Sequence, residues 1–475
     1  MKKYSQFRSR ISRFFWFVVL VCSFAAFARA ETFGDGDVVC FYGDSITHGG
    51  RFHYYIYDYY LTRFPEKNIT FVNAGVAGDN AGAAMTRIEE DIFVKNPSHV
   101  VLMFGMNDVG RGNYVADPSP EQSKRQENAL LAYERNMKQL VSALCEKNAP
   151  TLIFLTPSPF DDTGENDRNN NQPGCNGGLG RCAEIVKNLA DALNSQESTS
   201  GGAQGVPLVV DFHDQMTTLN LAKQATNPHF TLIGPDRVHP GATGHYVMAW
   251  LFLRAQNAPS LVSRVEISAD DATIASVENA QVSELRHENG ALSFCLCANA
   301  LPWPIESGGR AVLEFVPLAK DLNQEILRIR HLPPGQYALK IDGISVGEYS
   351  SEQFDEGIDL AFNEKTPQYQ QAQRVLALSN ARAVDERQLR NLAAVRWFLR
   401  LRHIDPDDLE SVRAFYEALP NKTGYFETKI PNYVDTWSSH AEWEKKVAHQ
   451  TTAVRAAAQP LARMYEVRQI ESASK

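Results

Sequence analysis

Short apolar runs alternate with longer amphipathic stretches between residues 37 and 259. The runs are rich in Val, Ile, Leu and Phe and lack polar alternation, which is typical of strands buried on both faces of a parallel sheet. They cover residues 38–42, 69–73, 99–104, 151–156 and 207–211. Helical patterns between them cover residues 81–94, 122–146, 182–194 and 241–256. This alternation predicts a three-layer, doubly wound α/β domain whose functional site lies beyond the carboxyl ends of its strands.

The pattern changes after Pro259. Residues 264–350 are predicted to form a small β-rich module, because apolar runs are separated by turn sequences such as Asp342-Gly343. Its predicted strands are 264–267, 292–297, 311–316, 326–331 and 337–341. Residues 351–475 are predicted to be a helical C-terminal segment, with helices over 370–381, 386–401 and 438–470.

The first thirty residues have the organisation of a secretory signal peptide. A basic stretch precedes the apolar run 14–27, and Ala28-Arg29-Ala30 has the form of a cleavage site. The run is shorter than the ~20 residues that a membrane-spanning helix needs, although an uncleaved membrane anchor is the alternative. We expect cleavage after Ala30, a first domain over residues 31–260, and a mature protein in the periplasm or outside the cell.

The charge of the chain changes when residues 1–30 are set aside. The 475-residue sequence has a formal net charge of −9, and this segment contributes six basic side chains and no acidic one. The remainder has 41 basic and 56 acidic residues, a net charge of −15. We expect no nucleic-acid partner, because neutralising phosphates requires a basic surface. No later stretch has the length of a membrane span, and the sequence does not indicate an oligomeric state.

Six cysteines follow the predicted cleavage site, too few for a disulfide scaffold in a chain of this length. Cys175 and Cys182 bracket a glycine-rich stretch and are the best candidates for a bridge in an exported protein. Cys40 lies in a predicted buried strand, where an inert thiol is expected. The cysteines lack the spacing of a zinc site with histidine partners, and no metal or cofactor is expected.

Ser45 follows the first predicted strand, in Gly43-Asp44-Ser45. A serine at this edge of the sheet can turn its hydroxyl toward a substrate and its own backbone N–H toward a developing oxyanion. Taken alone, Gly-Asp-Ser is more simply explained as a helix cap, since Ser and Asp are the usual capping residues.

Three further sequence blocks favour a catalytic role for Ser45 over a helix cap. Gly78 lies at a loop-to-helix junction after the second strand, where a backbone N–H can approach a ligand. Asn107 follows the third strand and places an amide side chain at the same sheet edge. Asp236 and His239 have a D-x-x-H spacing, which can fix the tautomer of the imidazole and stabilise its protonated form. Each has a purely structural alternative, as a turn, a cap or a surface residue, but four such coincidences in order are improbable.

These blocks resemble those of the SGNH (GDSL-type) hydrolases. The resemblance covers residues 37–256 and implies a flavodoxin-like fold and serine esterase activity, in a secreted multi-domain member. Ile46 stands where the family name has leucine, a change that affects no chemistry. The matching blocks are Gly43-Asp44-Ser45, Gly78, Gly105-Met106-Asn107-Asp108 and Asp236-Arg237-Val238-His239-Pro240.

The resemblance also implies roles for single residues. Ser45 would be the nucleophile, His239 the general base and then acid, and Asp236 the residue that orients His239. The backbone N–H groups of Ser45 and Gly78 and the side-chain amide of Asn107 would form the oxyanion hole. There is no G-x-S-x-G sequence, which argues against an α/β-hydrolase lipase.

The sequence predicts the substrate less clearly than it predicts the catalytic residues. A polar insertion over residues 160–182 and the lack of a long apolar lid favour a short acyl group on a hydrophilic carrier, with an O-acetyl ester on a carbohydrate as the best expectation. Lysophospholipase, thioesterase or lipase activity is the alternative within the family. A non-catalytic carbohydrate-binding surface protein is the alternative from another class, and Trp303 is either its exposed aromatic residue or a core residue.

Other residues near these blocks are weaker candidates. His48 and His53 are interpreted as packing or substrate-edge residues, and His245 as structural. A group of tyrosines forms either a packed helix face, which is favoured, or a platform for sugars. These tyrosines are Tyr54, Tyr55, Tyr57, Tyr59 and Tyr60.

Overall fold

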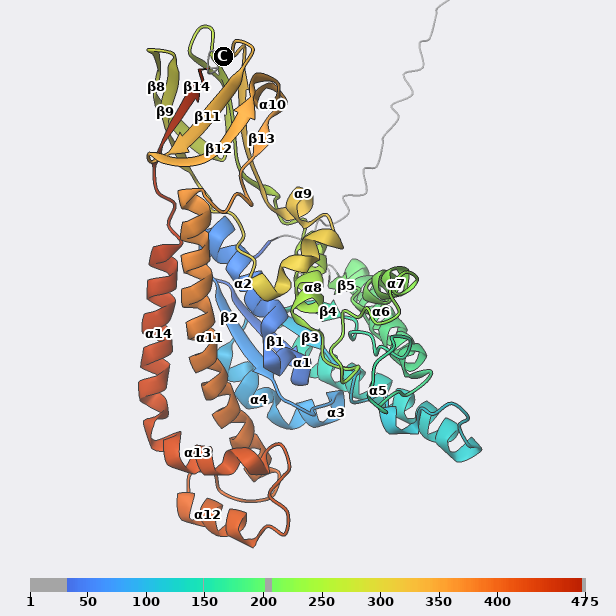
Figure 1. Ribbon diagram of the computed structural model, residues 1–475. Helices are drawn as coiled ribbons and strands as arrows, with labels where there is room; N and C mark the ends of the chain where they lie inside the picture. The colour runs from blue at the N-terminus through green and yellow to red at the C-terminus, as the bar shows by residue number, and fades with distance from the viewer. Residues whose placement is uncertain (1–31, 148, 201–206, 472–475) are drawn as a thin grey trace, which may run out of the picture.

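The computed structural model describes residues 32–147, 149–200 and 207–471. Figure 1 shows an elongated molecule with an α/β domain, a β-rich module at one end, and long C-terminal helices that run along one side. The predicted signal peptide, residues 1–30, lies outside the described residues. Within the described ranges, no helix combines the length and the hydropathy that a membrane span requires.

A five-stranded parallel sheet forms the centre of the α/β domain. Its neighbours follow the order β2-β1-β3-β4-β5, and every pair is parallel. Residues 39–42 are fully buried, as their unbroken apolar run predicted. Because β1 lies between β2 and β3, successive connections leave it in opposite directions and open a crevice at its carboxyl end. The strands are β1 (Val38–Gly43), β2 (Thr70–Gly75), β3 (His99–Met103), β4 (Thr151–Leu155) and β5 (Leu208–Val210).

Helices cover both faces of the sheet, which confirms the predicted three-layer α/β fold. On one face lies α2 (Arg51–Arg63), which packs against α8 (Ala242–Ala255). On the other face, α5 (Pro120–Glu146) contacts α3 (Ala81–Ala84) and α6 (Cys175–Ser200). The remaining elements of the domain are α1 (Ser45–Gly49), α7 (His213–Gln224) and the 3-10 helix η3 (Arg111–Asn113).

The helix predicted over residues 81–94 is broken into short turns. After α3 come η1 (Met85–Arg87), α4 (Ile88–Asp91) and η2 (Phe93–Lys95). Arg87 interrupts the helical backbone, with φ −123° and ψ 4°. Its buried guanidinium donates hydrogen bonds to the carbonyl oxygens of Ala74 and Gly43. A buried arginine that ties two strand ends together thus replaces a continuous amphipathic helix.

The β-rich module contains two sheets, with the orders β13-β10-β6-β7 and β12-β11-β14-β9-β8. Their apolar faces enclose a separate core that includes Val265, Phe294 and Leu339. Two short helices, α9 (Leu318–Leu322) and α10 (Ser351–Glu356), interrupt the strands in sequence. The strands are β6 (Leu261–Ser268), β7 (Thr273–Glu278), β8 (Ala280–Glu288), β9 (Ala291–Ala298), β10 (Gln324–Arg330), β11 (Gln336–Ile341), β12 (Ile344–Ser350), β13 (Ile358–Asp359) and β14 (Arg463–Gln469).

The prediction of a strand over residues 311–316 is wrong. This segment lies mostly in a 3-10 helix, η4 (Ser307–Glu314), which packs against α8. Val312 is buried in the core of the α/β domain, and the ring of Phe315 lies 5.0 Å from that of Phe230. Its apolar residues meet a helix rather than a neighbouring strand, a difference that a short apolar run does not reveal.

The C-terminal segment is mainly helical, as predicted, but its elements differ in extent. One helix, α11 (Pro367–Arg400), replaces the two predicted over 370–381 and 386–401, because no glycine or proline separates them. The elements after it are α12 (Leu409–Ala418), η5 (Glu427–Lys429), α13 (Ile430–Thr436), η6 (Trp437–Ser439) and α14 (His440–Ala457).

The helix predicted over residues 438–470 is wrong in its last part. α14 ends at Ala457, Pro460 follows, and β14 returns to the β-rich module between β11 and β9. Tyr465 and Val467 are buried on alternate positions, the period of a strand rather than a helix.

α11 connects the C-terminal segment to the α/β domain. It packs against α2, α14 and the edge strand β2, as Figure 1 shows. Ala372 and Val375 of α11 belong to the same core as Phe41. Nε of Arg390 donates to the carbonyl oxygen of Gly75 at 2.8 Å. The C-terminal helices therefore share the core of the α/β domain and hold the end of β2.

The candidate bridge between Cys175 and Cys182 is not formed, and both cysteines are free and buried. They are seven residues apart on α6, roughly 10 Å along a helix axis, whereas bridged Cα atoms lie within about 7 Å. Burial raises the pKa of the Cys175 thiol to about 12. These cysteines are packing residues.

The aromatic residues considered as sugar platforms lie in the core. The five tyrosines of α2 are buried, which confirms the packed-face interpretation. Trp303 is also buried, and its Nε1 donates to the carbonyl oxygen of Tyr55 at 3.1 Å. Trp303 is therefore not available to a glycan. His53 and His245 are buried as well, in agreement with structural roles.

Candidate active site

Ser45, His239 and Asp236 lie in contact. Oγ of Ser45 is 2.7 Å from Nε2 of His239, and Nδ1 of His239 is 2.6 Å from Oδ2 of Asp236. With the Nδ1 proton directed at the carboxylate, Nε2 is the acceptor for the Ser45 hydroxyl. This arrangement can remove a proton from Ser45 and stabilise the resulting imidazolium.

Ser45 is held at the carboxyl end of β1 by the first turn of α1. Asp44 caps this turn by accepting a hydrogen bond from the backbone N–H of Ile46 at 2.9 Å. A Cβ on Gly43 would lie 2.6 Å from the carbonyl oxygen of Met103, so this turn requires glycine. The capping role considered for Gly-Asp-Ser belongs to Asp44, which leaves the Ser45 hydroxyl free to contact His239.

Asp236 is fixed by the loop that carries it. Its Oδ1 accepts hydrogen bonds from the backbone N–H groups of Val238 and His239, at 3.1 and 3.0 Å. Partial burial acts to raise the pKa of Asp236, but hydrogen bonds from the backbone and imidazole of His239 and from Val238 outweigh it and hold the pKa below its ordinary value. An ionised carboxylate therefore faces His239.

Arg237, between these two residues, was not singled out from the sequence. It is buried and has a positive φ of 65°, a conformation that costs energy in any residue except glycine. Its guanidinium donates to the carbonyl oxygens of Asp161 and Gly164, at 2.6 and 2.8 Å, and to Asn170 at 3.0 Å. The polar insertion is thus anchored to the loop of Asp236 and His239. The only signal in the sequence was its place inside D-x-x-H.

Gly78 and Asn107 meet at the adjoining strand ends. The side-chain amide of Asn107 donates to the carbonyl oxygen of Asp79 at 2.8 Å, and so lies against the residue that follows Gly78. Gly78 has φ +77°, and nothing lies within 4 Å of the position that its Cβ would occupy. Ala77, on its other side, lines the same cleft as Ser45. The structure therefore brings all the predicted site residues to one sheet edge.

Buried carboxylates organise the loops around this edge. Asp108 accepts hydrogen bonds from the backbone N–H groups of Ala81 and Gly105, at 2.9 and 3.0 Å. Burial raises the pKa of Asp108 to about 7, and burial likewise raises the pKa of Asp44 to about 7. Asp79 pairs with Arg87. Asp44 and Asp108 stand inside the blocks recognised in the sequence, but their burial and their hydrogen bonds to these loops were not predicted, because a buried aspartate leaves no local pattern in a sequence.

Ser45 lines a cleft of about 420 Å³ whose other wall comes from the C-terminal segment. Across the described ranges, no group of three or more His, Cys, Asp or Glu side chains is arranged to hold a metal ion. The cleft residues from α1 and the following loops are Ser45, His48, Gly49 and Ala77. Those from α11, η5 and the residues before η5 are Val384, Arg387, Gln388, Asn391, Tyr425 and Lys429.

His48 bridges the two walls of the cleft. Its Nδ1 accepts the backbone N–H of Ala77 at 3.0 Å, so its Nε2 donates to Oδ1 of Asn391 at 3.1 Å. Burial, and then the charges of Arg390 and Lys429, lower the pKa of His48 to about 3. A neutral imidazole is therefore built into the site, which favours the packing interpretation of His48. The residues of the C-terminal wall were not predicted, since they lie more than 300 positions away from Ser45.

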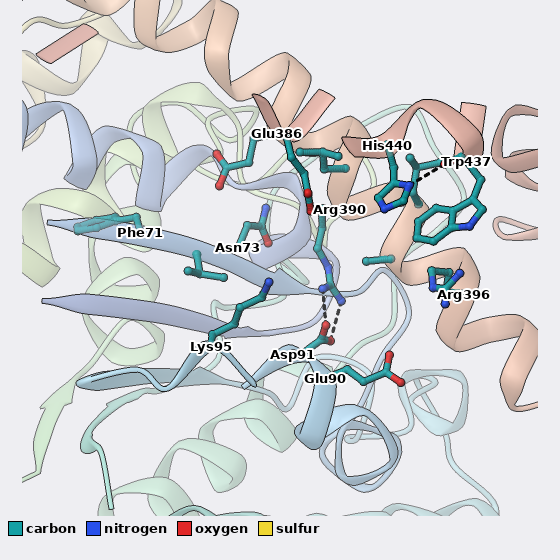
Figure 2. Close-up of a pocket in the computed structure, with 15 residues that line it drawn as sticks. Phe71, Asn73, Glu90, Asp91, Lys95, Glu386, Arg390, Arg396, Trp437 and His440 are labelled. Atoms are coloured by element: carbon teal, nitrogen blue, oxygen red, sulfur yellow. Dashed lines mark hydrogen bonds and ion pairs between the residues drawn. The ribbon is translucent and has the colours of Figure 1, made fainter. Parts of the chain in front are cut away.

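A second cavity, of about 350 Å³, lies between the edge of the sheet and the C-terminal helices (Figure 2). Arg390 and Asp91 form an ion pair inside it, with Nη1 and Oδ1 2.6 Å apart, and His440 stacks on Trp437 with ring centroids 4.0 Å apart. Ser45 does not line this cavity. This cavity lies at the contact between α11 and β2 and is not part of the candidate active site.

Comparisons with known proteins agree with this geometry. The model of the GDSL-like Lipase/Acylhydrolase family matches residues 38–252. An acetylxylan esterase from Geobacillus stearothermophilus is 27% identical over 236 residues, which cover 46% of this chain and 94% of the esterase. The uncharacterized lipoprotein YqeF from Bacillus subtilis (strain 168) is 29% identical over 144 residues, which cover 29% of this chain and 58% of the lipoprotein.

A solved structure resembles nearly the whole chain. It is BT4096, described as a gut microbial diltiazem-metabolizing enzyme, with 28% sequence identity and a TM-score of 0.82. The match covers 93% of this chain and 99% of BT4096, so the β-rich module and the C-terminal helices are shared as well. Residues 38–252 therefore match the SGNH (GDSL-type) hydrolase family, and the protein is a carboxylic ester hydrolase.

Proposed function

We propose that this protein is an exported esterase that removes short acyl groups, foremost O-acetyl groups, from a carbohydrate. The observation that carries the proposal is the chain of contacts from Ser45 through His239 to Asp236, with distances of 2.7 and 2.6 Å. A serine hydroxyl that donates to a carboxylate-oriented imidazole is the arrangement needed for an activated nucleophile.

In the first half of the reaction, Oγ of Ser45 attacks the carbonyl carbon of the ester while Nε2 of His239 takes the hydroxyl proton. The oxyanion is stabilised by the backbone N–H groups of Ser45 and Gly78 and the side-chain amide of Asn107. When the tetrahedral intermediate collapses, the alcohol leaves with the proton from His239 and the acyl group stays on Ser45.

In the second half, a water molecule attacks the acyl-enzyme. Nε2 of His239 takes a proton from this water and returns it to Ser45 as the carboxylic acid leaves. Asp236 remains ionised throughout, because its hydrogen bonds to the loop hold its pKa low, and it stabilises His239 when the imidazole is charged.

The lining of the cleft supports a short acyl group on a polar carrier. Most side chains facing Ser45 across the cleft are polar or charged, including Arg387, Gln388, Asn391 and Lys429. A long acyl chain would need a continuous apolar surface to gain from burial. The similarity to an acetylxylan esterase supports a carbohydrate ester, and the signal-like residues 1–30 support export to the periplasm or the cell exterior.

An ester of a small organic molecule is a second candidate substrate. The similarity to a diltiazem-metabolizing enzyme favours it, because that likeness spans 93% of the chain, including the wall of the cleft that α11 provides. The two candidates share one catalytic mechanism and differ in the alcohol that leaves.

The test is a screen of acetylated polysaccharides and small acetate esters with the protein that begins at Glu31. We expect acetate release from at least one glycan, no release by the Ser45→Ala variant, and faster hydrolysis of acetyl than of octanoyl esters. A strong preference for octanoyl esters would eliminate the sugar deacetylase. Near-native activity of Ser45→Ala would eliminate the catalytic assignment itself.

A further inference from the structure

The wall of the cleft opposite Ser45 carries two cationic side chains. Arg387 comes from α11 and Lys429 from η5, and both line the cleft together with Ser45. No aspartate or glutamate is among the residues that line this cleft in the described part of the chain. The cleft therefore has a positive wall, although the protein as a whole is acidic.

These two cations lack the partners that neighbouring cations have. On α11, Arg382 pairs with Glu386 and Arg390 with Asp91, and closer to its end Arg396 pairs with Asp407. Within the described residues, neither Arg387 nor Lys429 forms an ion pair with an acidic side chain. The Lys429 ammonium instead lies over the ring of Tyr425, 4.6 Å from its centroid.

Lys429 shows that this arrangement has an energetic cost. Its side chain is half-buried, and this burial lowers its pKa, because removal from water disfavours the charged form. A half-buried ammonium without a carboxylate is expected to be stabilised by an anion that enters the cleft. Low-dielectric walls also concentrate such a field at the mouth of a cleft.

We infer that Arg387 and Lys429 bind an anionic group, a carboxylate or a sulfate, that the substrate carries on its alcohol part. The inference rests on the proposed function, because it assigns the group next to the ester that Ser45 would attack. It makes the C-terminal segment a determinant of specificity: the α/β domain supplies the groups that break the ester, and α11 and η5 select the charge of its carrier.

The experiment compares acetate esters that differ in charge on one scaffold. The neutral ester is methyl para-acetoxybenzoate, the anionic esters are para-acetoxybenzoate and para-acetoxybenzenesulfonate, and the cationic ester is meta-acetoxyphenyltrimethylammonium. Acetylated oligogalacturonate and its methyl-esterified form repeat the comparison on a glycan. The carboxylate and sulfonate arms identify which anion the site prefers.

For Arg387→Gln and Lys429→Gln we expect kcat/KM for the preferred anionic ester to fall about tenfold each, the size typical of a partly buried charge contact. Activity on the neutral ester should fall by a clearly smaller factor than activity on the anionic ester, and added salt should reduce the anion preference of the wild type. The control is Arg413→Gln, which removes an exposed cation of α12 that does not line the cleft. Arg387→Lys should retain much of the preference.

A wild type that hydrolyses neutral, anionic and cationic esters equally well would overturn the inference, as would equal losses on all esters in the two variants. Calorimetric binding of unacetylated oligogalacturonate, compared with its methyl ester, separates the inference from the proposed function. Charge-selective binding that the two variants lose, without turnover of any ester, would support the anion site and count against the esterase. Ester turnover without charge selectivity would support the esterase and count against the anion site.

Discussion

Nε2 of His48 lies 3.1 Å from Oδ1 of Asn391, which is 343 residues further along the chain. On its other side His48 accepts the backbone N–H of Ala77, the residue before Gly78. A side chain of α11 therefore fixes the ring that holds the loop carrying one proposed oxyanion donor. Asn391 is a positioning residue that acts through His48, and neither is required to touch the reacting atoms.

We expect Asn391→Ala to lower kcat about tenfold with little change in KM, because a misplaced oxyanion donor weakens transition-state binding and leaves ground-state binding intact. Steady-state kinetics on a neutral acetate ester measure this. Asn391→Asp keeps the acceptor oxygen and should retain most of the activity. Gln370→Ala, at an exposed position of the same helix that does not line the cleft, is the control. Equal effects on kcat and KM in Asn391→Ala would contradict the positioning role.

The side-chain amide of Asn107 is the one proposed oxyanion donor that mutation can remove directly. Asn107→Ala should reduce kcat on the order of 10²–10³-fold and leave residual activity, whereas Ser45→Ala should leave none. Asn113→Ala is the control, since its amide donates to the nearby carbonyl oxygen of Gly110 and not to the loop of Gly78. Near-native turnover by Asn107→Ala would remove this residue from the oxyanion hole.

Arg237 combines a strained backbone with strong side-chain contacts, and two variants separate these effects. Arg237→Ala loses the hydrogen bonds to Asp161, Gly164 and Asn170 and keeps the positive φ. Arg237→Gly loses the same bonds and relieves the strain, so it should be more stable than Arg237→Ala by about 1 kcal/mol. Both should show a lower kcat than the wild type. Chemical denaturation and steady-state kinetics give the two readouts, and a glycine variant less stable than the alanine variant would contradict the strain argument.

Asp44 should make the protein less stable as the pH rises. Burial raises its pKa to about 7, well above that of an unfolded aspartate, so the folded state binds more protons than the unfolded state between pH ~4 and ~7. The neutral form is present below this window, and stability is lost as the pH rises through it. Asp44→Asn keeps the oxygen that accepts from Ile46 but cannot ionise. The free energy of unfolding of the variant minus that of the wild type should therefore be larger at pH 8 than at pH 4, by a few kcal/mol. Thermal unfolding of both proteins at both pH values tests this. A stability difference between variant and wild type that is the same at pH 4 and pH 8 would contradict the prediction.

The ion pair of Arg390 and Asp91 fastens α11 to the α/β domain. Both side chains are at most 12% exposed, so Arg390→Met leaves the buried Asp91 with Arg87 as its remaining ion-pair partner. We expect this variant to destabilise the fold by about 3 kcal/mol, the lower end of the range for a broken buried pair. Arg400→Met breaks a surface pair with Glu90 and should cost less than about 1 kcal/mol. Adding Asp91→Asn to Arg390→Met should recover part of the loss. Denaturant unfolding of the three variants checks this order.

Burial acts to raise the pKa of Asp91, but Arg390 and then Arg87 outweigh it and lower the pKa to about 2. The stability that this carboxylate contributes is therefore present above pH ~4 and lost as the pH falls toward 2.

The parts of the fold that depend on local pattern could be predicted from the sequence. The five buried strands of the first sheet are continuous apolar runs, and the residues at their carboxyl ends meet in space because parallel strands end at one edge. For this reason the positions of Ser45, Gly78 and Asn107 directly after these runs were enough to predict a shared site. The loop of Asp236 and His239 was recognisable because its D-x-x-H spacing has a chemical purpose.

The parts that depend on long-range contacts could not be predicted. Lys429 and Asn391 line the cleft only because α11 packs on β2, and no local pattern encodes that contact. The run 311–316 has the length and composition of a strand, and its partner, α8, is distant in sequence. The end of the last helix was misplaced because the alternation of Tyr465 and Val467 is short and becomes informative only next to β11 and β9.

The position of β14 has a consequence for how this protein forms during synthesis. β14 pairs with β11, and the ion pair of Arg463 with Asp342 spans 121 residues. Until that strand has been made, β11 and β9 each expose an unpaired edge on the side that β14 will occupy. Exposed strand edges are the features that cells must shield from aggregation. The nascent β-rich module therefore needs either rapid completion or the protection of a chaperone.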